Sequence, residues 1–322
     1  MCVILTDMPS FLNRLLKLET IAAIDLGSNA LRAIIARKNG DELEIVKSFR
    51  EPLRLGEDVF NTGMISDEKM QATEEAFIKL FHIFTEFNVT DIRAMATSAM
   101  RDSKNGPTLA KRIAQSTGIE IETINGNEEA NIIFGAVKGQ VDLKKKVAIL
   151  MDIGGGSTEL IVVKNEEIAA VESFNVGTVR LLTLNQEALE KQIAFQLDKM
   201  IDFIKHHIKI KDIDLFIGTG GNLRRIGKIR KKMLGGATSQ LATFDEIHHM
   251  EESILSMSYV DRIRRLELDR NRADVILPAI MLTHHLMQRL KLDEIHLPKV
   301  GLKEGILLSM LEVPPKKLIL KD

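Results

Sequence analysis

The 322-residue chain carries 44 Lys and Arg residues against 45 Asp and Glu residues, which gives a formal net charge of −1. A charge this close to zero excludes a general electrostatic attraction to nucleic acid or to a membrane surface, so an anionic ligand would need a local basic patch. The single cysteine, Cys2, excludes an internal disulfide and favours a reducing, cytoplasmic setting.

The N-terminal segment lacks the basic start of a secretion signal, and no apolar run approaches the ~20 residues that cross a bilayer. Residues 10–19 carry apolar side chains at helical spacing, which predicts a short amphipathic helix packed on the body of the protein. We therefore expect a cytoplasmic protein with no membrane and no nucleic-acid partner. The length of the chain favours two domains.

The first predicted strands surround a short polar loop. An apolar run at 21–24 leads into Asp25-Leu26-Gly27-Ser28-Asn29, and a second apolar run follows at 31–36. Asn39-Gly40 predicts a hairpin turn into a third strand at 44–48.

Predicted helices and strands alternate along the rest of the chain, as expected for mixed α/β lobes. Helical spacing and capping residues predict helices at 66–87, 107–117, 127–137, 186–207, 244–257, 271–290 and 302–311. Short apolar runs predict strands at 92–96, 119–124, 147–150, 161–163, 168–174, 215–217 and 294–297. Asn127 is expected to cap the third helix, whose first turn carries Glu128 and Glu129.

The most informative segment is Met151-Asp152-Ile153-Gly154-Gly155-Gly156-Ser157-Thr158-Glu159-Leu160, which lies between two predicted strands. Glycine lets the backbone approach a ligand closely, and successive amide N–H groups beside two hydroxyl groups form a nest for phosphate oxygens. A carboxylate aimed at bare phosphate would repel it, so Asp152 makes chemical sense with Mg²⁺ between the two. The alternative interpretation is a hairpin turn with an incidental aspartate.

The same order of features occurs earlier, in Ala22-Ala23-Ile24-Asp25-Leu26-Gly27-Ser28-Asn29. The wide separation of Asp25 from Asp152 fits two similar lobes rather than a short repeat. Two phosphate-binding hairpins that face each other across a cleft are typical of the actin-like ATPase superfamily.

Within that superfamily the chain resembles the exopolyphosphatase and guanosine pentaphosphate phosphohydrolase family (Ppx/GppA) from about Ile21 to Leu311. The resemblance rests on both hairpins and on six further motifs in order: Ala96-Thr97-Ser98-Ala99-Met100-Arg101-Asp102, Gly126-Asn127-Glu128-Glu129-Ala130, Gly177-Thr178-Val179-Arg180, Gly218-Thr219-Gly220-Gly221, Arg272-Ala273-Asp274 and Gly301-Leu302-Lys303-Glu304-Gly305. We expect the short, two-domain form of this family, without the phosphohydrolase domain that longer members append.

The resemblance implies two actin-like, ribonuclease H-like α/β lobes, each with a mixed β-sheet flanked by helices, and a cleft between them. Lobe I is expected to comprise residues 1–126 together with about 302–322, because the last helix of family members packs back on the first lobe. Lobe II is expected to comprise residues 127–301. The sequence leaves a homodimer open.

The resemblance also implies roles for individual residues. Glu129 is expected to be the base that activates water, with Glu128 as the alternative, and the helix dipole should keep its carboxylate ionised. Asp152 and Glu159 are expected to hold Mg²⁺, with Mn²⁺ as the alternative cation, although Glu159 would serve equally as a solvated strand residue. The expected phosphate-binding set comprises Asp25, Gly27, Ser28, Asn29, Arg101, Gly154, Gly155, Gly156, Ser157, Thr158, Gly220 and Gly221.

Two features of the sequence each allow two interpretations. Arg101 is either a phosphate clamp or a surface partner of Asp102. The basic segment Arg224, Arg225, Lys228, Arg230, Lys231 and Lys232 is either a solvated helix face or a cationic track for polyphosphate. The adjacent histidine pairs at 206–207, 248–249 and 284–285 are not expected to chelate a metal, because neighbours on a helix point about 100° apart.

We therefore predict a Mg²⁺-dependent phosphoanhydride hydrolase that releases the terminal phosphate of polyphosphate or the 5′ phosphate of guanosine pentaphosphate. One alternative is a sensor that binds polyphosphate or guanosine tetra- and pentaphosphate, (p)ppGpp, with little turnover, and another is an ATPase or kinase of the same superfamily. Ala30 and Asn222 depart from the family pattern beside the expected phosphate loops, which leaves the substrate preference open.

Overall fold

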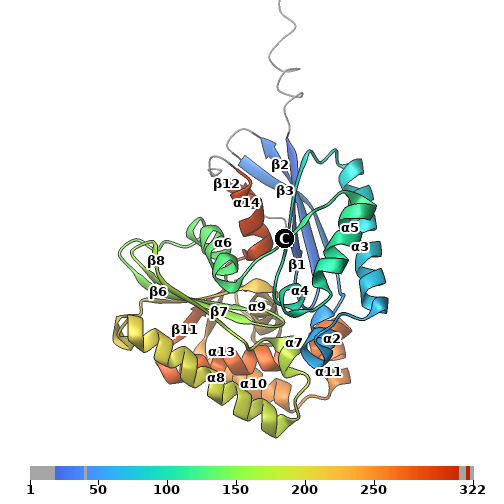
Figure 1. Cartoon of the computed structure of the whole chain (residues 1–322). Helices are drawn as coiled ribbons and strands as arrows, with labels where there is room; N and C mark the ends of the chain where they lie inside the picture. Colours follow the sequence, from blue (N-terminus) through green and yellow to red (C-terminus); the bar gives the residue numbers. More distant parts are fainter. Residues whose placement is uncertain (1–18, 40–41, 312–316, 320–322) are drawn as a thin grey trace, which may run out of the picture.

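The computed structural model describes residues 19–39, 42–311 and 317–319. In this part of the chain, two six-stranded mixed β-sheets alternate with layers of helices, which confirms the predicted fold class (Figure 1). The helix expected at 10–19 and the Asn39-Gly40 turn lie wholly or partly outside the described residues. No described helix combines the length and the apolar character that spanning a bilayer requires.

The first sheet has the strand order β12-β3-β2-β1-β4-β5. Its strands are β1 (Thr20–Leu26), β2 (Leu31–Asn39), β3 (Glu42–Glu51), β4 (Asp91–Ala96), β5 (Ile121–Thr123) and β12 (Lys317–Ile319). The first three form an antiparallel meander, whereas β4 runs parallel to β1 and β5 runs parallel to β4.

The second sheet repeats this arrangement, with the order β10-β11-β9-β6-β7-β8. Its strands are β6 (Val147–Ile153), β7 (Thr158–Lys164), β8 (Glu167–Phe174), β9 (Leu215–Thr219), β10 (Leu241–Thr243) and β11 (Glu294–His296). Again a three-stranded antiparallel meander comes first, β9 runs parallel to β6, and β11 runs parallel to β9. The sixth strands differ, because β12 lies beside β3 whereas β10 lies beside β11. The duplication suggested by the two hairpin motifs is therefore present in the strand topology.

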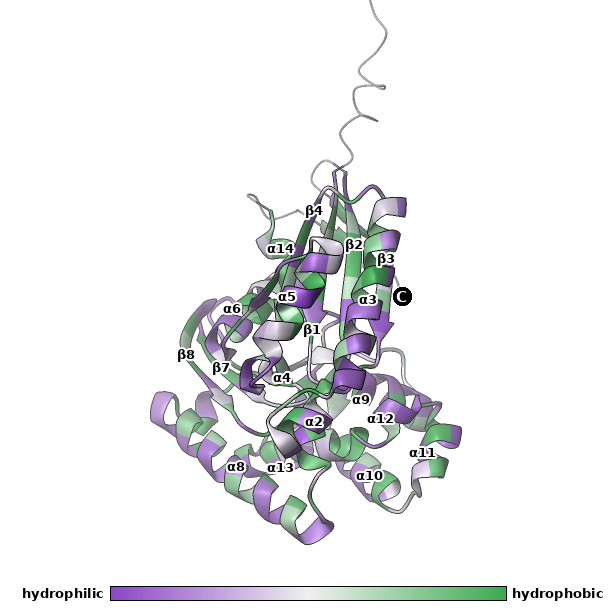
Figure 2. Cartoon of the chain, turned by 45° about the vertical axis from the view of Figure 1, so that its right-hand side comes forward, coloured by the Kyte–Doolittle hydropathy of each residue, from purple (hydrophilic) through white to green (hydrophobic). Residues whose placement is uncertain are grey.

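The outer faces of the two sheets are covered by different helices. On the first sheet, α3 (Asp67–Glu86) and α5 (Gly106–Thr117) bury apolar residues that include Phe77 and Leu109. On the second sheet the covering helices are α8 (Gln186–His207), α9 (Gly220–Leu234), α10 (Phe244–Leu255) and α13 (Ile276–Leu290). Hydrophilic residues recur along α3 and α8 in Figure 2, as expected for helices with one face in water.

Two helices lie between the sheets. These are α6 (Gly126–Lys138) and α14 (Leu302–Ser309), which pack against each other. One apolar core joins Ala23 of the first sheet, Leu150 of the second sheet and Ile306 of α14. Although α14 follows the last strand of the second sheet, it contacts β1 and β2 of the first (Figure 1). The assignment of residues 1–126 and 302–322 to one lobe stays a prediction.

Short elements account for most differences from the predicted pattern. The helices α2 (Leu55–Thr62), α4 (Ser98–Asp102), α7 (Thr178–Leu181) and α11 (Tyr259–Leu266), with the 3₁₀ turn Ile210–Asp212, were not predicted. The single helix predicted at 271–290 is instead α12 (Arg270–Ala273) followed by α13. The break lies at Asp274, whose side chain accepts a 2.8 Å hydrogen bond from the N–H of Val275.

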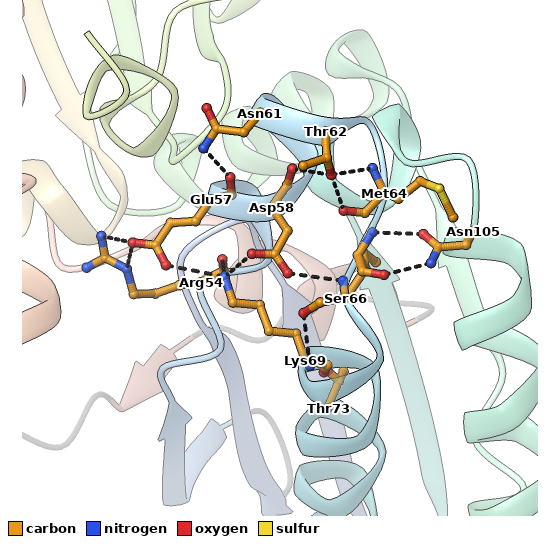
Figure 3. Close-up of polar contacts among 11 residues, drawn as sticks. Arg54, Glu57, Asp58, Asn61, Thr62, Met64, Ser66, Lys69, Thr73 and Asn105 are labelled. Atoms are coloured by element: carbon orange, nitrogen blue, oxygen red, sulfur yellow. Dashed lines mark hydrogen bonds and ion pairs between the residues drawn. The ribbon is translucent and has the colours of Figure 1, made fainter. Parts of the chain in front are cut away.

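A polar network fixes α2 between the two halves of the chain (Figure 3). The ammonium group of Lys69 donates to the carboxylate of Asp58 and to the carbonyl of Arg54, each at 2.7 Å. Arg54 precedes α2 at a positive φ of 51°, and its guanidinium donates to Asp274 at 2.6 Å. This cluster therefore ties the first lobe to the helical layer of the second.

Candidate active site

A pocket lies where β1 and β6 end and the two glycine-containing hairpins meet. The predicted site residues that line it are Asp25, Gly27, Ser28, Asn29, Glu129, Asp152, Gly154, Gly155, Ser157, Gly220 and Gly221. Its other lining residues, which were not assigned to the site from the sequence, are Arg32, Thr97, Ser98, Ile153, Asn222, Arg224, Gly301, Leu302, Lys303 and Glu304. Segments far apart in the sequence thus face one cavity.

The two hairpins touch each other directly. A Cβ added at Gly155 would lie 2.9 Å from the Cβ of Ser28 and 3.3 Å from the backbone nitrogen of Asn29. The hydroxyl of Ser28 lies 2.8 Å from the Ser98 hydroxyl and accepts a hydrogen bond from the N–H of Ala99 at 3.1 Å. Because only a residue without a side chain permits this approach, Gly155 brings the two backbone loops together.

Asp25 and Asp152 occupy matching positions in the two sheets but have different partners. Asp25 lies opposite Arg32 across the β1–β2 pair, and Asp152 lies opposite Glu159 across the β6–β7 pair. Arg32 donates to Asp25 at 3.0 Å, whereas Asp152 accepts a 2.8 Å hydrogen bond from the hydroxyl of Thr219. The first aspartate is therefore neutralised by a cation, while the second lies beside another acid.

Three acids form a buried cluster, which we call the acidic trio: Glu129, Asp152 and Glu159. One carboxylate oxygen of each residue lies within 4.8 Å of the others. Glu159 accepts a 2.8 Å hydrogen bond from Ser173, but one oxygen of Glu159 and one of Glu129 are buried with no hydrogen-bond partner among the described residues. Unpaired buried carboxylate oxygens are costly, and oxygen donors are what Mg²⁺ and Mn²⁺ prefer. The trio therefore fits a hard divalent cation.

Burial raises the pKa of all three carboxyl groups. The pKa of Glu129 lies well above its usual range because of burial and the nearby charges of Glu159, Asp152 and Asp25. Burial and the charge of Asp152 raise the pKa of Glu159 to about 7, and burial raises the pKa of Asp152. The raised pKa opposes the expected effect of the helix dipole on Glu129. A bound cation would favour the ionised forms again.

The structure separates the roles of the two adjacent glutamates. Asn125, not the expected Asn127, caps α6, and its side chain accepts hydrogen bonds from the N–H groups of Asn127 and Glu128 at 2.9 and 3.0 Å. Glu128 closes this capping box by accepting from the N–H of Asn125 at 2.8 Å. Glu129, by contrast, lines the pocket. Glu128 is thus engaged at the helix start and is not placed to act as the alternative base.

Four predicted site residues do not line the pocket: Arg101, Gly156, Thr158 and Glu159. The hydroxyl of Thr158 donates to the carbonyl of Val176 at 2.6 Å inside the core, so this geometry does not support its expected contact with phosphate. Arg101 donates to the carbonyl of Ile124 at 3.1 Å and lies 3.6 Å from Asp102. Its charge still reaches the trio, where it opposes the rise in the pKa of Glu129. Glu159 belongs to the trio behind the pocket wall.

Three cations outside the predicted phosphate-binding set line the pocket: Arg32, Arg224, which belongs to the predicted basic segment, and Lys303. Arg32 lies at the same sequence offset from Asp25 as Glu159 does from Asp152, so the internal repeat contained a signal for it. Lys303 contacts Glu304, and burial lowers its pKa. Helix α9 also begins at the pocket, and its N-terminal residue pair, Gly220 and Gly221, offers backbone N–H groups to an anion.

The pocket opens into a wide groove with a volume of about 810 Å³. The groove adds six basic side chains to those of the pocket: Arg50, Arg225, Lys228, Lys231, Arg272 and Lys299. Among its lining residues the only acid is Glu304. Two members of the basic segment point elsewhere, since Arg230 pairs with Glu246 at 2.7 Å and Lys232 pairs with Glu267 at 2.6 Å. The segment is therefore partly a track and partly a paired surface.

Two repeated α/β lobes, with a glycine-rich, cation-lined pocket at the ends of β1 and β6, define a protein of the actin-like fold class. Comparison with known proteins gives the family. The Ppx/GppA phosphatase family matches residues 34–313, and the chain belongs to it.

Solved structures are similar to this chain along most of its length. The exopolyphosphatase from Cytophaga hutchinsonii has a TM-score of 0.83 with 24% identity, covering 91% of this chain and 97% of that one. The Ppx/GppA family member from Aquifex aeolicus has a TM-score of 0.75 with the same identity and coverage. At this identity the similarity shows the fold.

A relative in sequence is the bifunctional 3-dehydroquinate synthase/phosphatase of Fusobacterium nucleatum. It is 29% identical over 286 residues, which cover 83% of this chain and 43% of that protein. The chain therefore spans less than half the length of this curated relative.

Proposed function

We propose that the protein is a Mg²⁺-dependent phosphoanhydride hydrolase that releases the terminal phosphate of inorganic polyphosphate, the 5′ phosphate of guanosine pentaphosphate, or both. Membership of the Ppx/GppA phosphatase family supports hydrolysis of a phosphate ester or anhydride. The observation that carries the proposal is the acidic trio, which lies beside a glycine nest and cationic side chains in one pocket. Arg32, Arg224 and Lys303 pair with Asp25 or Glu304. Among the described residues, no ion pair joins the acidic trio to a basic side chain, so the trio is available to a cation.

The chain's own residues would divide the chemistry between them. The Gly154–Gly155 hairpin, the start of α9, Arg32 and Lys303 would bind the oxygens of the terminal phosphate. Asp152 and Glu159 would hold Mg²⁺, which when bound neutralises charge on the transferring phosphoryl group. Glu129 would accept a proton from the attacking water as the new P–O bond forms and the bridging P–O bond breaks. The shortened chain would leave with the bridging oxygen.

The basic side chains of the groove support a substrate with several phosphate groups. Its basic residues come from β3, α9 and the segments around α12 and α14, and they continue the cationic wall of the pocket. A row of cations binds a polyanion through charge and places little demand on its shape. This wall therefore suits polyphosphate, and it also suits the phosphate chains at the 5′ and 3′ positions of guanosine pentaphosphate.

The test is a side-by-side assay of phosphate release by purified protein in Mg²⁺. We expect release from polyphosphate, from guanosine pentaphosphate, or from both, at a rate above that from ATP. Faster turnover of ATP would favour the ATPase alternative. Binding of guanosine tetraphosphate in calorimetry, with no phosphate released from any of the three substrates, would favour the sensor.

A further inference from the structure

A second group of metal-ligating side chains lies in the helical layer on the outer face of the second sheet. It comprises Glu251 on α10 with His284 and His285 on α13, and one ligand atom of each residue lies within 4.8 Å of the others. None of the three lines the pocket or the basic groove. This histidine cluster is therefore separate from the proposed catalytic site.

Both histidines converge on the same carboxylate. Nδ1 of His284 lies 2.5 Å from one oxygen of Glu251, and Nε2 of His285 lies 3.2 Å from the other oxygen. The sequence-based expectation that adjacent histidines cannot chelate considered one helix alone. Here α10 packs against α13 and supplies an acid between the two rings, so side chains that diverge at the backbone meet at their tips.

One of the three side chains is open to solvent. His285 is partly exposed, which gives a route from solvent, while Glu251 and His284 are largely shielded. The 2.5 Å contact with Glu251 places the proton of the neutral His284 ring on Nδ1, while Nε2 is buried without a hydrogen-bond partner among the described residues. A metal bound at Nδ1 would leave the ring proton on Nε2. The His248 ring lies beside the His284 ring, with 4.9 Å between ring centroids. Nitrogen donors combined with one carboxylate are a set that Zn²⁺ accepts and Mg²⁺ does not favour.

We propose that Glu251, His284 and His285 bind a divalent transition-metal cation of the Zn²⁺ class and clamp α10 to α13. The cation replaces the hydrogen atoms now shared between the carboxylate and the two rings. Because α13 also packs against α8 and α9, the clamp stabilises the helical layer behind the start of α9. The proposal does not depend on the hydrolase function.

The test uses the full chain, stripped with a chelator and titrated with Zn²⁺ against a chromogenic competitor. Excess Mg²⁺ is present throughout so that the oxygen-only acidic trio is already occupied. We expect one tightly bound Zn²⁺ per chain. His285→Ala should weaken binding at least about tenfold, in line with changes around metal sites, because it removes one donor. His249→Ala, an exposed position on α10 outside the cluster, should bind as the wild type does.

A second readout guards against a variant that fails to fold. Co²⁺ bound through imidazole gives visible absorption bands, which should form in the wild type and His249→Ala and be absent in His285→Ala. Zn²⁺ should also raise the melting temperature of the wild type but not of His285→Ala, since a cation that binds only the folded state stabilises it. The proposal is overturned if no Zn²⁺ binds in the presence of Mg²⁺, or if His285→Ala binds as tightly as His249→Ala.

Discussion

Glu128 and Glu129 are neighbours at the start of α6, but their side chains have different roles. Glu128 completes the capping box of α6 and Glu129 enters the acidic trio. The sequence motif identified both, and the family resemblance favoured Glu129. The motif could not show that Asn125 is the N-cap of α6, because Asn125 and Asn127 are equally good capping residues. Only the position of the cap fixes which acid faces the pocket.

The different roles of these acids predict different outcomes for Glu128. Glu128→Gln should keep both stability and turnover, because a glutamine at this position also completes a capping box. Glu128→Ala should keep turnover but lower the free energy of unfolding by up to about 1 kcal/mol, the usual scale for a lost cap. Denaturant unfolding and phosphate release measure the two effects. A large loss of turnover in Glu128→Gln would show that Glu128 takes part in the chemistry.

The acidic trio predicts how stability depends on pH without metal. The folded pKa of Glu159 is raised from 4.5 to about 7, so its contribution is fully present below pH 4.5 and is lost as the pH rises through 7. The loss should be on the order of 3 kcal/mol by pH 8.

Thermal unfolding in a chelator from pH 5 to pH 8 measures this effect. We expect the wild type to lose more stability over that range than Glu159→Gln does, because the amide cannot ionise. Mg²⁺ should reduce the difference. Identical pH profiles for the wild type and Glu159→Gln would contradict the raised pKa.

At the scale of elements, the hairpins and the start of α9 set the site. Gly220 has a φ of 85°, and a Cβ there would lie 2.4 Å from the carboxylate of Asp152. The opposite end of the same helix offers a matched control, because Gly235 also has a positive φ of 82° but a Cβ there would meet nothing within 4 Å.

We expect Gly235→Ala to lower the free energy of unfolding by about 1 kcal/mol through backbone strain while turnover stays near the wild type. Gly220→Ala should suffer the same strain and also displace Asp152, so its turnover should fall well below that of Gly235→Ala. Parallel unfolding and activity measurements separate the effects. Equal turnover in the two variants would show that the position of Asp152 is not critical.

Element prediction succeeded where a pattern covered several turns and failed where it did not. The bounds of α8 match the predicted helix at 186–207, and Ser66 caps α3 as predicted. In contrast, α4 and α7 are too short to show helical periodicity. The break before α13 depends on the side chain of Asp274, which the apolar spacing of the segment does not reveal.

At the scale of the whole molecule, the internal repeat made most of the architecture predictable. Two copies of one motif indicated two lobes, and five strands of each sheet follow the same order. The basic groove was only partly predictable, because it combines Arg50 of β3 with Arg225 of α9 and Arg272 of α12. Residues this distant in the sequence carry no local pattern that places them together.

The groove predicts a salt-sensitive contribution to substrate binding. Arg225→Gln should raise the KM for long polyphosphate, leave kcat nearly unchanged and lower the slope of log KM against log salt by about 1. Lys191→Gln, on the exposed face of α8 and paired with Glu187, should change none of these. If both variants behave alike, the groove is not the polyanion track.

In the proposed function, Glu129 of the acidic trio activates water against a terminal phosphate held between the two lobes. The most direct measurement is the steady-state rate of phosphate release by Glu129→Gln and by the wild type in saturating Mg²⁺, on whichever substrate the wild type turns over. We predict a loss of about 10²–10⁴ in kcat with an unchanged melting profile, the range expected for a positioned base. Wild-type turnover by a folded Glu129→Gln protein would show that Glu129 is not the base.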